Sequence, residues 1–592
     1  MMAMAILITL GASLLFLTLS GGGLFPSTVC LVAIVTSGLA CLITFRNACP
    51  QLKRSQGRVL PHLEIILGLI LLFILITALP LPPALDVLAG SLRNQQNQTV
   101  VTSLQEAAQC GAQPLMEDPW FCLSRNRAGT LRFFLLLASA ISAFLLSAAL
   151  PAKGKIRLLT FLAILGTGIG VAGYIGQWKI PQGDTLWWFI QIPHAPTSPV
   201  GCFLNRNHFA GFVAMLCPVA LALAAYACTT RRWITASVHI GLTCLMAGVV
   251  YMSLSRGAML AMIVGLVITS LMIAFRHRLL WGLLVLALIV AGSGLLVTQS
   301  PVIRERLAGI HTPSQLNSVN SRLNEWRESL RVWPHFPLIG AGSNALRMVY
   351  PQYRQTSVGA RLIHAENEYI QLVAECGLVG VILSLALIWT IRQRVRQAPT
   401  PLPAVITTSV TGALSVIAIH CLFDFPAHLP LYALVLGMLA GLLLTPAPET
   451  QPAHHWIVLL PTLVAFLGAI SIACYHPANM RIMDDQNYLY KAKIRELHRA
   501  LIWAPTSPAW LYLGRTMLQE ASVMRNESLS HQAEAFITQA VLLDPQNYRL
   551  WYEVGQVRLS LGDNQRAADA FNKAQALRYW LTPPPIPGVN TR

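Results

Sequence analysis

Long apolar runs with almost no charged residues fill the chain up to about residue 475. A helix that spans a bilayer needs roughly 20 apolar residues. The pattern therefore predicts an all-α fold, a polytopic membrane helix bundle over residues 1–475. About thirteen runs reach the required length: 3–20, 28–45, 62–80, 131–150, 157–176, 208–227, 235–254, 257–275, 279–298, 371–391, 403–421, 429–446 and 456–475.

The pattern changes after residue 476, where charged residues become common and no apolar run approaches the length of a span. This change predicts a separate soluble domain over 476–592. A set of small and aromatic residues recurs 34 residues later along the chain: Ala533, Ile537 and Ala540 as Ala567, Phe571 and Ala574, with Trp510 and Gly514 before the first set and Trp551 and Gly555 before the second. The period resembles the tetratricopeptide repeat, a stack of paired helices that commonly binds peptides or proteins. An unrelated pair of helical hairpins is the alternative.

Charge supports a membrane protein. Only 11% of the residues are charged, less than half of the share in an average soluble protein. This scarcity excludes both a single soluble globular enzyme and a disordered chain. Lys and Arg outnumber Asp and Glu by 42 to 24, a net charge of +18. In a membrane protein such an excess is expected from the positive-inside rule, so it does not indicate nucleic-acid binding.

The basic residues also predict the orientation of the chain. Clusters of Lys and Arg lie at 46–58, 151–157, 231–232, 276–278 and 392–396. All of them fall on the same side if the thirteen spans simply alternate, which predicts a cytoplasmic N-terminus. Three long loops, 81–130, 177–207 and 299–370, then lie outside together with the C-terminal domain. Cys110 and Cys122 lie in the first loop, either as a disulfide or as two unpaired thiols.

Polar residues gather at the predicted outer ends of spans, in the stretches 201–211, 253–257, 339–375 and 424–430. Arginines there suit an anionic group, because a guanidinium binds phosphate through two hydrogen bonds and stays protonated. A carboxylate or imidazole beside them suits a base that removes a proton from a hydroxyl. Together they indicate a lipid-linked phosphate donor and a hydroxyl acceptor. Taken singly, an arginine at a span end also fits a membrane anchor, and a histidine there also fits a structural role.

Four sequence motifs resemble the O-antigen ligase/polymerase superfamily (Wzy_C-like, WaaL-like): N-R-N-H-F-A-G at 205–211, S-R-G at 255–257, G-x-G with Y-P-x-Y-R at 340–354, and H-A-E-N-E-Y-I-Q-L-x-A-E-x-G-L-x-G at 364–380. The resemblance covers about residues 60–446. It implies an inverting, metal-independent glycosyltransferase of the GT-C type without a cofactor. The donor would be a glycan on undecaprenyl pyrophosphate, and the acceptor a hydroxyl on lipid A-core, a polysaccharide or a protein. The implied location is the periplasmic face of the bacterial inner membrane.

The resemblance also assigns roles to residues. Arg206, Arg256 and Arg354 would bind the pyrophosphate. The ligases usually carry a histidine directly before the motif's asparagine, but this chain has Glu366 there, with His364 two residues earlier. We favour Glu366 as the catalytic base over His364. The supporting residues would be Asn205, Asn207, His208, Asn367, Tyr369, Glu375 and Asp424.

Several alternatives remain at the level of sequence. A polymerase of the same superfamily fits the same motifs, and neither the sugar nor the acceptor is identified. A transporter of a lipid-linked anion is a third interpretation, although transporters usually show inverted repeats and broken helices at mid-membrane. Within the loop 299–370, which we interpret as a folded lid, Arg322, Arg327 and Arg331 are expected only to solvate an amphipathic helix.

Overall fold

A computed structural model of the chain describes fifteen segments, and every structural statement below concerns them: 2–20, 31–32, 35–39, 62–81, 121–179, 185–186, 190–191, 200–277, 313–350, 353–354, 364–396, 402–444, 507–524, 527–543 and 548–577. Three features predicted from the sequence lie outside these residues: the domain boundary near residue 476, the span 279–298 and Cys110.

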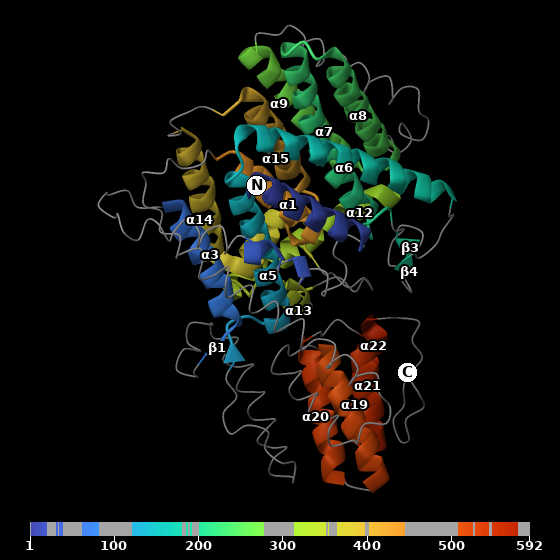
Figure 1. The fold of residues 1–592 in the computed structure, drawn as a ribbon. Coiled ribbons are helices and arrows are strands. Elements are labelled where there is room, and N and C mark those ends of the chain that lie inside the picture. Colours follow the sequence, from blue (N-terminus) through green and yellow to red (C-terminus); the bar gives the residue numbers. More distant parts are fainter. Residues whose placement is uncertain are drawn as a thin grey trace, which may run out of the picture.

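Helices make up almost all of the described structure (Figure 1). Those of the apolar region are α1 (Met2–Leu19), α3 (His62–Ala78), α5 (Arg127–Ala148), α6 (Ala152–Lys179), α7 (Arg206–Thr229), α8 (Trp233–Met252), α9 (Arg256–His277), α14 (Glu368–Arg396), α15 (Ala404–His420) and α16 (Pro430–Leu442). Between α9 and α14 lie α12 (Pro313–Leu330), the short η4 (Trp333–His335) and α13 (Leu346–Val349), and η6 (Pro426–His428) lies between α15 and α16. Two strand pairs of two residues each, β1 (Pro80–Leu81) with β2 (Phe121–Cys122) and β3 (Thr185–Leu186) with β4 (Ile190–Gln191), are too short to alter the all-α class.

Seven of the described helices are long and apolar enough to cross a membrane: Met2–Leu19, Gly129–Ala148, Ala152–Gly176, Arg206–Thr229, Trp233–Met252, Arg256–Phe275 and Glu368–Arg396. Three shorter apolar helices follow the same pattern: Ile65–Ala78, Ala404–His420 and Pro430–Leu442. These ten coincide with ten of the predicted runs, and they indicate a multi-pass membrane protein. The runs 279–298 and 456–475 and most of 28–45 fall outside the described residues, so thirteen spans stay a prediction.

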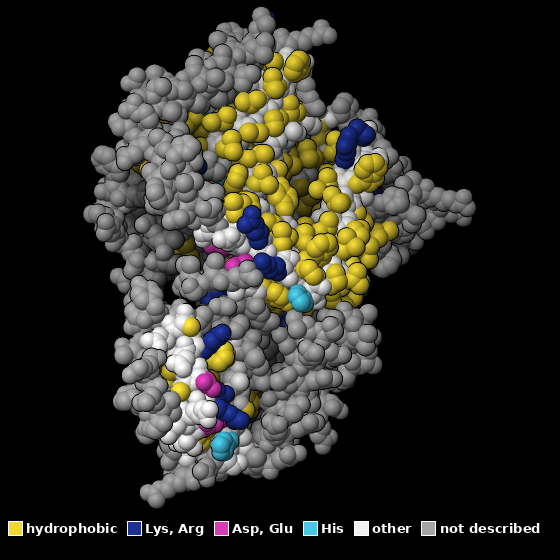
Figure 2. Space-filling model, turned by 180° about the vertical axis from the view of Figure 1, so that it is seen from behind, with side chains coloured by type: hydrophobic (Ala, Val, Ile, Leu, Met, Phe, Trp, Pro, Cys, Tyr) yellow, Lys and Arg dark blue, Asp and Glu magenta, His cyan; other side chains and the backbone are white. Residues whose placement is uncertain are grey.

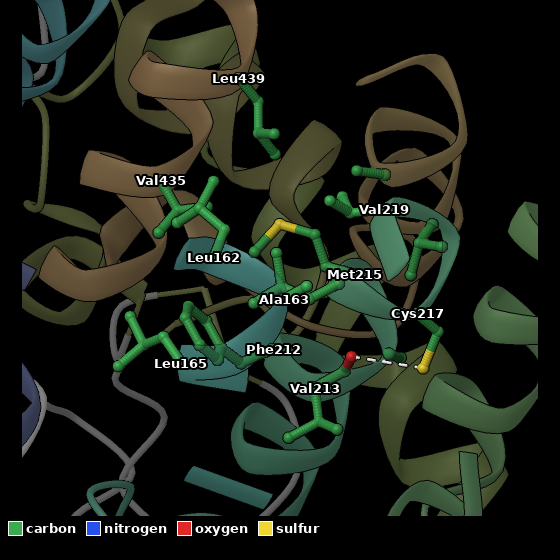
Figure 3. Close-up of a cluster of buried hydrophobic side chains, with 14 of the residues drawn as sticks. Leu162, Ala163, Leu165, Phe212, Val213, Met215, Cys217, Val219, Val435 and Leu439 are labelled. Carbon is green, nitrogen blue, oxygen red and sulfur yellow. Dashed lines mark hydrogen bonds between the residues drawn. The ribbon is translucent and has the colours of Figure 1, made fainter. Parts of the chain in front are cut away.

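The bundle core lies around α7, which packs against α6, α8, α9 and α15. In the close-up of Figure 3, Leu162 and Leu165 of α6, Phe212 of α7 and Val435 of α16 point into one shared apolar cluster. Glycines of α6 allow α7 to pack closely against it. A Cβ at Gly173 of α6, for example, would lie 2.6 Å from the ring of Phe209 on α7. Helix α7 is therefore packed between its neighbours on several sides, which fixes the position of its first turn and of the polar residues there.

Other helices expose apolar side chains instead of burying them. Figure 2 shows hydrophobic side chains covering much of one face of the molecule. Large apolar residues are exposed along α8 and α14: Trp233, Ile234, Val238, Ile240, Leu245 and Met252 on the first, and Leu378, Ile382, Leu385, Ile388 and Trp389 on the second. A soluble protein would hide such stripes, whereas lipid tails solvate them.

Lys155 has a structural role that the charge analysis did not predict. The sequence counts it in the basic cluster 151–157, and its side chain is completely buried. Its ammonium group donates hydrogen bonds to the carbonyls of Leu442 and Leu444, at the C-terminal end of α16. The last carbonyls of a helix lack partners within the helix and carry partial negative charge. Lys155 therefore caps α16 rather than facing the aqueous phase.

Four helices form the described part of the predicted C-terminal domain: α19 (Ser507–Met524), α20 (Glu527–Leu543), α21 (Tyr548–Ser560) and α22 (Asn564–Leu577). They pack as two consecutive hairpins, drawn in red in Figure 1. Gly514 faces Ile537 in the first hairpin, and Gly555 faces Phe571 in the second. Residues that recur in the sequence thus occupy matching positions in space, while the tetratricopeptide identity itself stays a prediction.

Candidate functional site

The polar stretches predicted at one face of the membrane meet at the ends of four helices. The amide of Asn367 donates to the carbonyl of Leu422 at 3.1 Å, and the backbone N–H of Glu368 donates to the carbonyl of Cys421 at 2.9 Å. These bonds join the start of α14 to the turn between α15 and α16. A Cβ added to Gly257 would lie 3.3 Å from that of Phe423, so the start of α9 packs on the same turn.

Asp424 lies at the centre of this junction, with an exposed fraction of 1%. Each of its carboxylate oxygens faces a histidine. Nε2 of His208, in the first turn of α7, lies 2.9 Å from one oxygen, and Nε2 of His420, at the end of α15, lies 3.1 Å from the other. Burial alone would raise the pKa of Asp424, but the two histidines outweigh it and hold that pKa well below its usual range. Asp424 is therefore an ionised carboxylate that ties α7, α15 and the following turn together.

Glu366 lies two residues before the start of α14, next to Asn367. The side chain of Asn367 caps that helix, since its oxygen accepts hydrogen bonds from the backbone N–H groups of Tyr369 and Ile370 at 3.0 and 3.1 Å. Glu366 has a φ of +51°, in the left-handed region that residues with a side chain rarely adopt. Such a backbone conformation persists only where the surrounding structure holds it.

The carboxyl of Glu366 is partly shielded from water and faces charges of both signs. Nη2 of Arg322 lies 3.8 Å from Oε2 of Glu366. Burial and the charge of Asp424 raise the pKa of Glu366 to about 7, against the opposing effects of Arg322 and His208. Such a group is present in both protonation states at neutral pH, as a general base requires.

Arg322 corrects the sequence analysis. We expected it, with Arg327 and Arg331, only to solvate the amphipathic helix of the loop, but the structure pairs it with Glu366. The spacing of the charged residues on α12 does not by itself indicate which of them turn toward α14. Arg327 remains an exposed residue of α12, as expected.

His364 lies in a second polar group, built on the first two turns of α14. Nδ1 of His364 is 2.7 Å from Nε2 of Gln371. His428 of η6 is held between two carboxylates, with Nδ1 3.0 Å from Glu368 and Nε2 3.4 Å from Glu375. Burial works against a charged imidazole, but the two carboxylates outweigh it and raise the pKa of His428 to about 10. His428 is thus a buried cation.

Sequence reasoning missed Gln371, Glu368 and His428 as members of the site. A signal was present for two of them, because Glu368, Gln371 and Glu375 follow each other at intervals of three and four residues. Such residues share one face of a helix. His428 comes from a distant part of the chain, and only the fold places it beside them.

Glu375, predicted as a supporting residue, holds the loop before α14 in place. Its two carboxylate oxygens accept hydrogen bonds from the backbone N–H groups of Asn344 and Leu346, at 2.6 and 3.0 Å. The neighbouring loop residues form backbone hydrogen bonds with α14: Ala341 N–H to Ala374 O and Gly342 N–H to Glu375 O. The segment 336–346 is therefore fastened along the first turns of α14.

The remaining predicted residues lie at the ends of their helices. Asn205 caps α7 by accepting a hydrogen bond from the N–H of Asn207 at 2.8 Å, and Arg206 follows with an exposed side chain. Arg256 is the first residue of α9 and is partly buried. Arg354 follows α13, where its backbone N–H donates to the carbonyl of Tyr350. The hydroxyl of Tyr369 donates to the carbonyl of Ala418 at 2.8 Å, a contact that joins α14 to α15.

Within the described residues, no group of three or more His, Cys, Asp or Glu side chains is arranged to hold a metal ion. The chemistry that these residues themselves offer is proton transfer at Glu366 and anion binding by the arginines at the ends of α7 and α9. Both sit at one end of the bundle, beside helices whose apolar faces are exposed. The arrangement suits a reaction between a lipid-borne anion and a proton-donating acceptor.

Comparison with known proteins supports this interpretation. Residues 241–385, about a quarter of the chain, match the family described as O-antigen ligase. The matched segment includes Arg256, Arg322 and the residues from His364 to Glu375, and it supports the ligase/polymerase superfamily, whose members are glycosyltransferase-like enzymes. No curated protein in the comparison matches the chain.

Proposed function

We propose that the protein transfers a glycan from undecaprenyl pyrophosphate to a hydroxyl group at the periplasmic face of the inner membrane. The acceptor is lipid A-core, a polysaccharide or a protein, and the enzyme is an inverting, metal-independent transferase of the GT-C type. The observation that carries the proposal is Glu366, a carboxyl with its pKa raised to about 7 at a strained position beside the lipid-facing bundle.

In this reaction the acceptor oxygen attacks the anomeric carbon of the donor glycan. A bond forms between these two atoms as the bond from the anomeric carbon to the diphosphate oxygen breaks. Glu366 takes the proton of the acceptor hydroxyl, and undecaprenyl diphosphate leaves with the electron pair. Attack opposite to the leaving group inverts the configuration at the anomeric carbon.

Arg206 and Arg256 are assigned to the diphosphate, with Arg354 as a third candidate. They begin α7 and α9, and the first turns of both helices are linked to the turn that carries Asp424. Negative charge grows on the leaving diphosphate in the transition state. Fixed guanidinium groups stabilise such developing charge and therefore raise the rate of the chemical step.

The test is a transfer assay with purified protein, an undecaprenyl-pyrophosphate glycan and a panel of acceptors. Arg206→Ala and Arg256→Ala should each lower kcat/KM by about 10²-fold or more. Arg392→Ala, at the opposite end of α14, removes an arginine of the same type and should transfer glycan normally. Normal rates in both site variants would show that these arginines do not act on the donor.

The acceptor panel separates the candidate functions. Extension of a growing glycan indicates a polymerase, and transfer to lipid A-core or to a protein indicates a ligase. Movement of the donor across the bilayer without any glycosidic product would indicate a transporter instead. Glu366 favours an enzyme, since transport of a permanently anionic lipid does not require a group that accepts a proton at neutral pH.

Arg322→Ala should move the pH dependence of transfer. The Arg322 cation stabilises the ionised form of Glu366, so its removal raises the pKa of Glu366 further and shifts the rising limb of kcat/KM to higher pH. The displacement should be small, because the pair is partly exposed. Arg327→Ala, on the same helix, is the matched control. Equal displacements in the two variants would point to a general effect of charge on α12.

A further inference from the structure

The amide of Gln371 has only one orientation that satisfies its neighbours. Its Oε1 atom accepts a hydrogen bond from the backbone N–H of Ala365 at 3.1 Å. This bond places Nε2 on the opposite side, 2.7 Å from Nδ1 of His364. An amide nitrogen only donates hydrogen bonds, so Nδ1 of His364 must accept one. A neutral imidazole that accepts at Nδ1 carries its proton on Nε2.

The second hydrogen of the Gln371 amide also has a partner, which strengthens this assignment. Oε1 of Glu375 lies 3.3 Å from the same nitrogen. His428, 3.2 Å away, does not compete as an acceptor, because as a cation it donates from both ring nitrogens to Glu368 and Glu375. The amide therefore donates to His364 and Glu375.

The surroundings of His364 disfavour a positive charge on its ring. The centroid of the His428 ring lies 5.0 Å from that of His364. Burial, followed by the charge of His428, lowers the pKa of His364 well below its usual range, and His208 and Arg347 act in the same direction. Only the hydrogen bond from Gln371 opposes this shift. Both the geometry and the charges thus keep His364 neutral.

The ring of His364 is also fixed in direction. It stacks on Phe425 with the ring centroids 4.0 Å apart and an angle of 18° between the planes. Phe425 is held from another side by the edge of His208 at 4.8 Å. Within the segments that the structure describes, no hydrogen bond is formed by Nε2 of His364. Among these described residues the Nε2–H group of His364 therefore has no acceptor.

We propose that His364 binds a phosphate oxygen of the lipid-linked diphosphate through its Nε2–H group and does not act as the base. The inference rests on the proposed function, within which it separates two roles: Glu366 accepts the proton, and His364 donates a hydrogen bond. The positive charges of His428 and Arg347 act on the ring of His364. A neutral imidazole is an effective donor to such an oxygen, as it is in enzymes that use one as an electrophile.

A pair of amide substitutions tests which ring nitrogen matters. In His364→Gln the side-chain nitrogen reaches the position of Nε2, and in His364→Asn it reaches that of Nδ1. The probe is undecaprenyl diphosphate, the product of the proposed reaction, which binds without reacting; its affinity is measured by titration into protein in nanodiscs. His364→Asn should bind it about 10- to 100-fold more weakly than wild type, and His364→Gln should recover most of that loss. Equal losses in the two variants, or none in either, would overturn the proposal.

The protonation state is measured directly by ¹⁵N NMR of the full-length protein labelled at histidine, with the His364 signals assigned by their absence in His364→Gln. Nδ1 should show the shift of an unprotonated nitrogen and Nε2 that of a protonated one, with no change between pH 6 and pH 8. A doubly protonated ring or a proton on Nδ1 would overturn the assignment.

The two proposals can fail separately. If wild-type protein binds undecaprenyl diphosphate through His364 and yet forms no glycosidic product with any acceptor, the transferase proposal fails and the binding role of His364 stands. If transfer occurs and both amide variants bind the probe as wild type does, the role of His364 fails and the transferase proposal stands.

Discussion

Glu366→Gln should reduce the kcat/KM of glycan transfer by about 10²- to 10⁴-fold, the usual contribution of a general base. The amide keeps the size and polarity of the side chain but accepts no proton from the acceptor hydroxyl. In wild-type protein kcat/KM should rise with pH through about 7, because only the ionised carboxyl acts as the base. The measurement is a series of initial rates between pH 5.5 and pH 8.5 at low donor concentration. The residual activity of Glu366→Gln should lack this rising limb.

Thermal stability distinguishes this chemical effect from misfolding. The pKa of Glu366 is raised in the folded state above the value of an unfolded glutamate, so its ionisation disfavours the fold. This cost is absent below the unfolded pKa and complete above about 7, so it grows as the pH rises through that window. Glu366→Gln should therefore melt at the same temperature as wild type or higher at pH 8. A variant that is both inactive and less stable at pH 8 would count against a catalytic role.

The choice between Glu366 and His364 shows where sequence reasoning stops. The motif places Glu366 directly before the asparagine that caps α14, and its role as the base stays a prediction. The state of His364 depends instead on Gln371, which is oriented by the backbone of Ala365, and on His428, which comes from beyond α15. Periodicity locates residues on a helix face, but it does not give the direction of an amide or the charge of a distant neighbour.

For the fold as well, the sequence predicts the helices but not the contacts between them. Apolar runs long enough to span a membrane predicted ten of the described helices, because lipid requires every backbone group of a span to be bonded within it. The capping role of Lys155 was not predicted, since it depends on how the start of α6 lies beside the end of α16. The pairing of Arg322 with Glu366 was missed for a similar reason, because it depends on how α12 lies across α14.

Gly340 and Gly377 form the junction between the loop and α14. At Gly377 the backbone leaves the helical conformation, with φ +58° and ψ −159°. The N–H groups of Leu378 and Val379 consequently donate to the carbonyls of Pro337 and Leu338, both at 3.0 Å, instead of to carbonyls within α14. Gly340, with φ +72°, lies directly against the backbone of Glu375. The loop thus replaces helix hydrogen bonds that the break removes.

Gly340→Ala and Gly377→Ala should each destabilise this junction by about 3 kcal/mol or more, since each combines a left-handed backbone with overlap of fixed atoms. A Cβ on Gly377 would lie 2.6 Å from the nitrogen of Gly340, and one on Gly340 would overlap the carbonyl of Glu375. Both clashes are with backbone, which no change of side-chain rotamer relieves. Limited proteolysis of purified protein should show faster cleavage within 313–350, and transfer should be lost because Glu375 no longer holds the loop.

Gly241→Ala on α8 is the matched control. This glycine is helical, and a Cβ on it would meet open space, so the substitution should leave stability unchanged or raise it slightly. If all three variants resisted proteolysis equally and transferred glycan equally, the junction would not be required to hold the loop. Loss of transfer with unchanged proteolysis would instead separate the geometry of the site from the stability of the loop. Because Glu375 binds both the loop backbone and His428, the expected result is that protection and transfer are lost together.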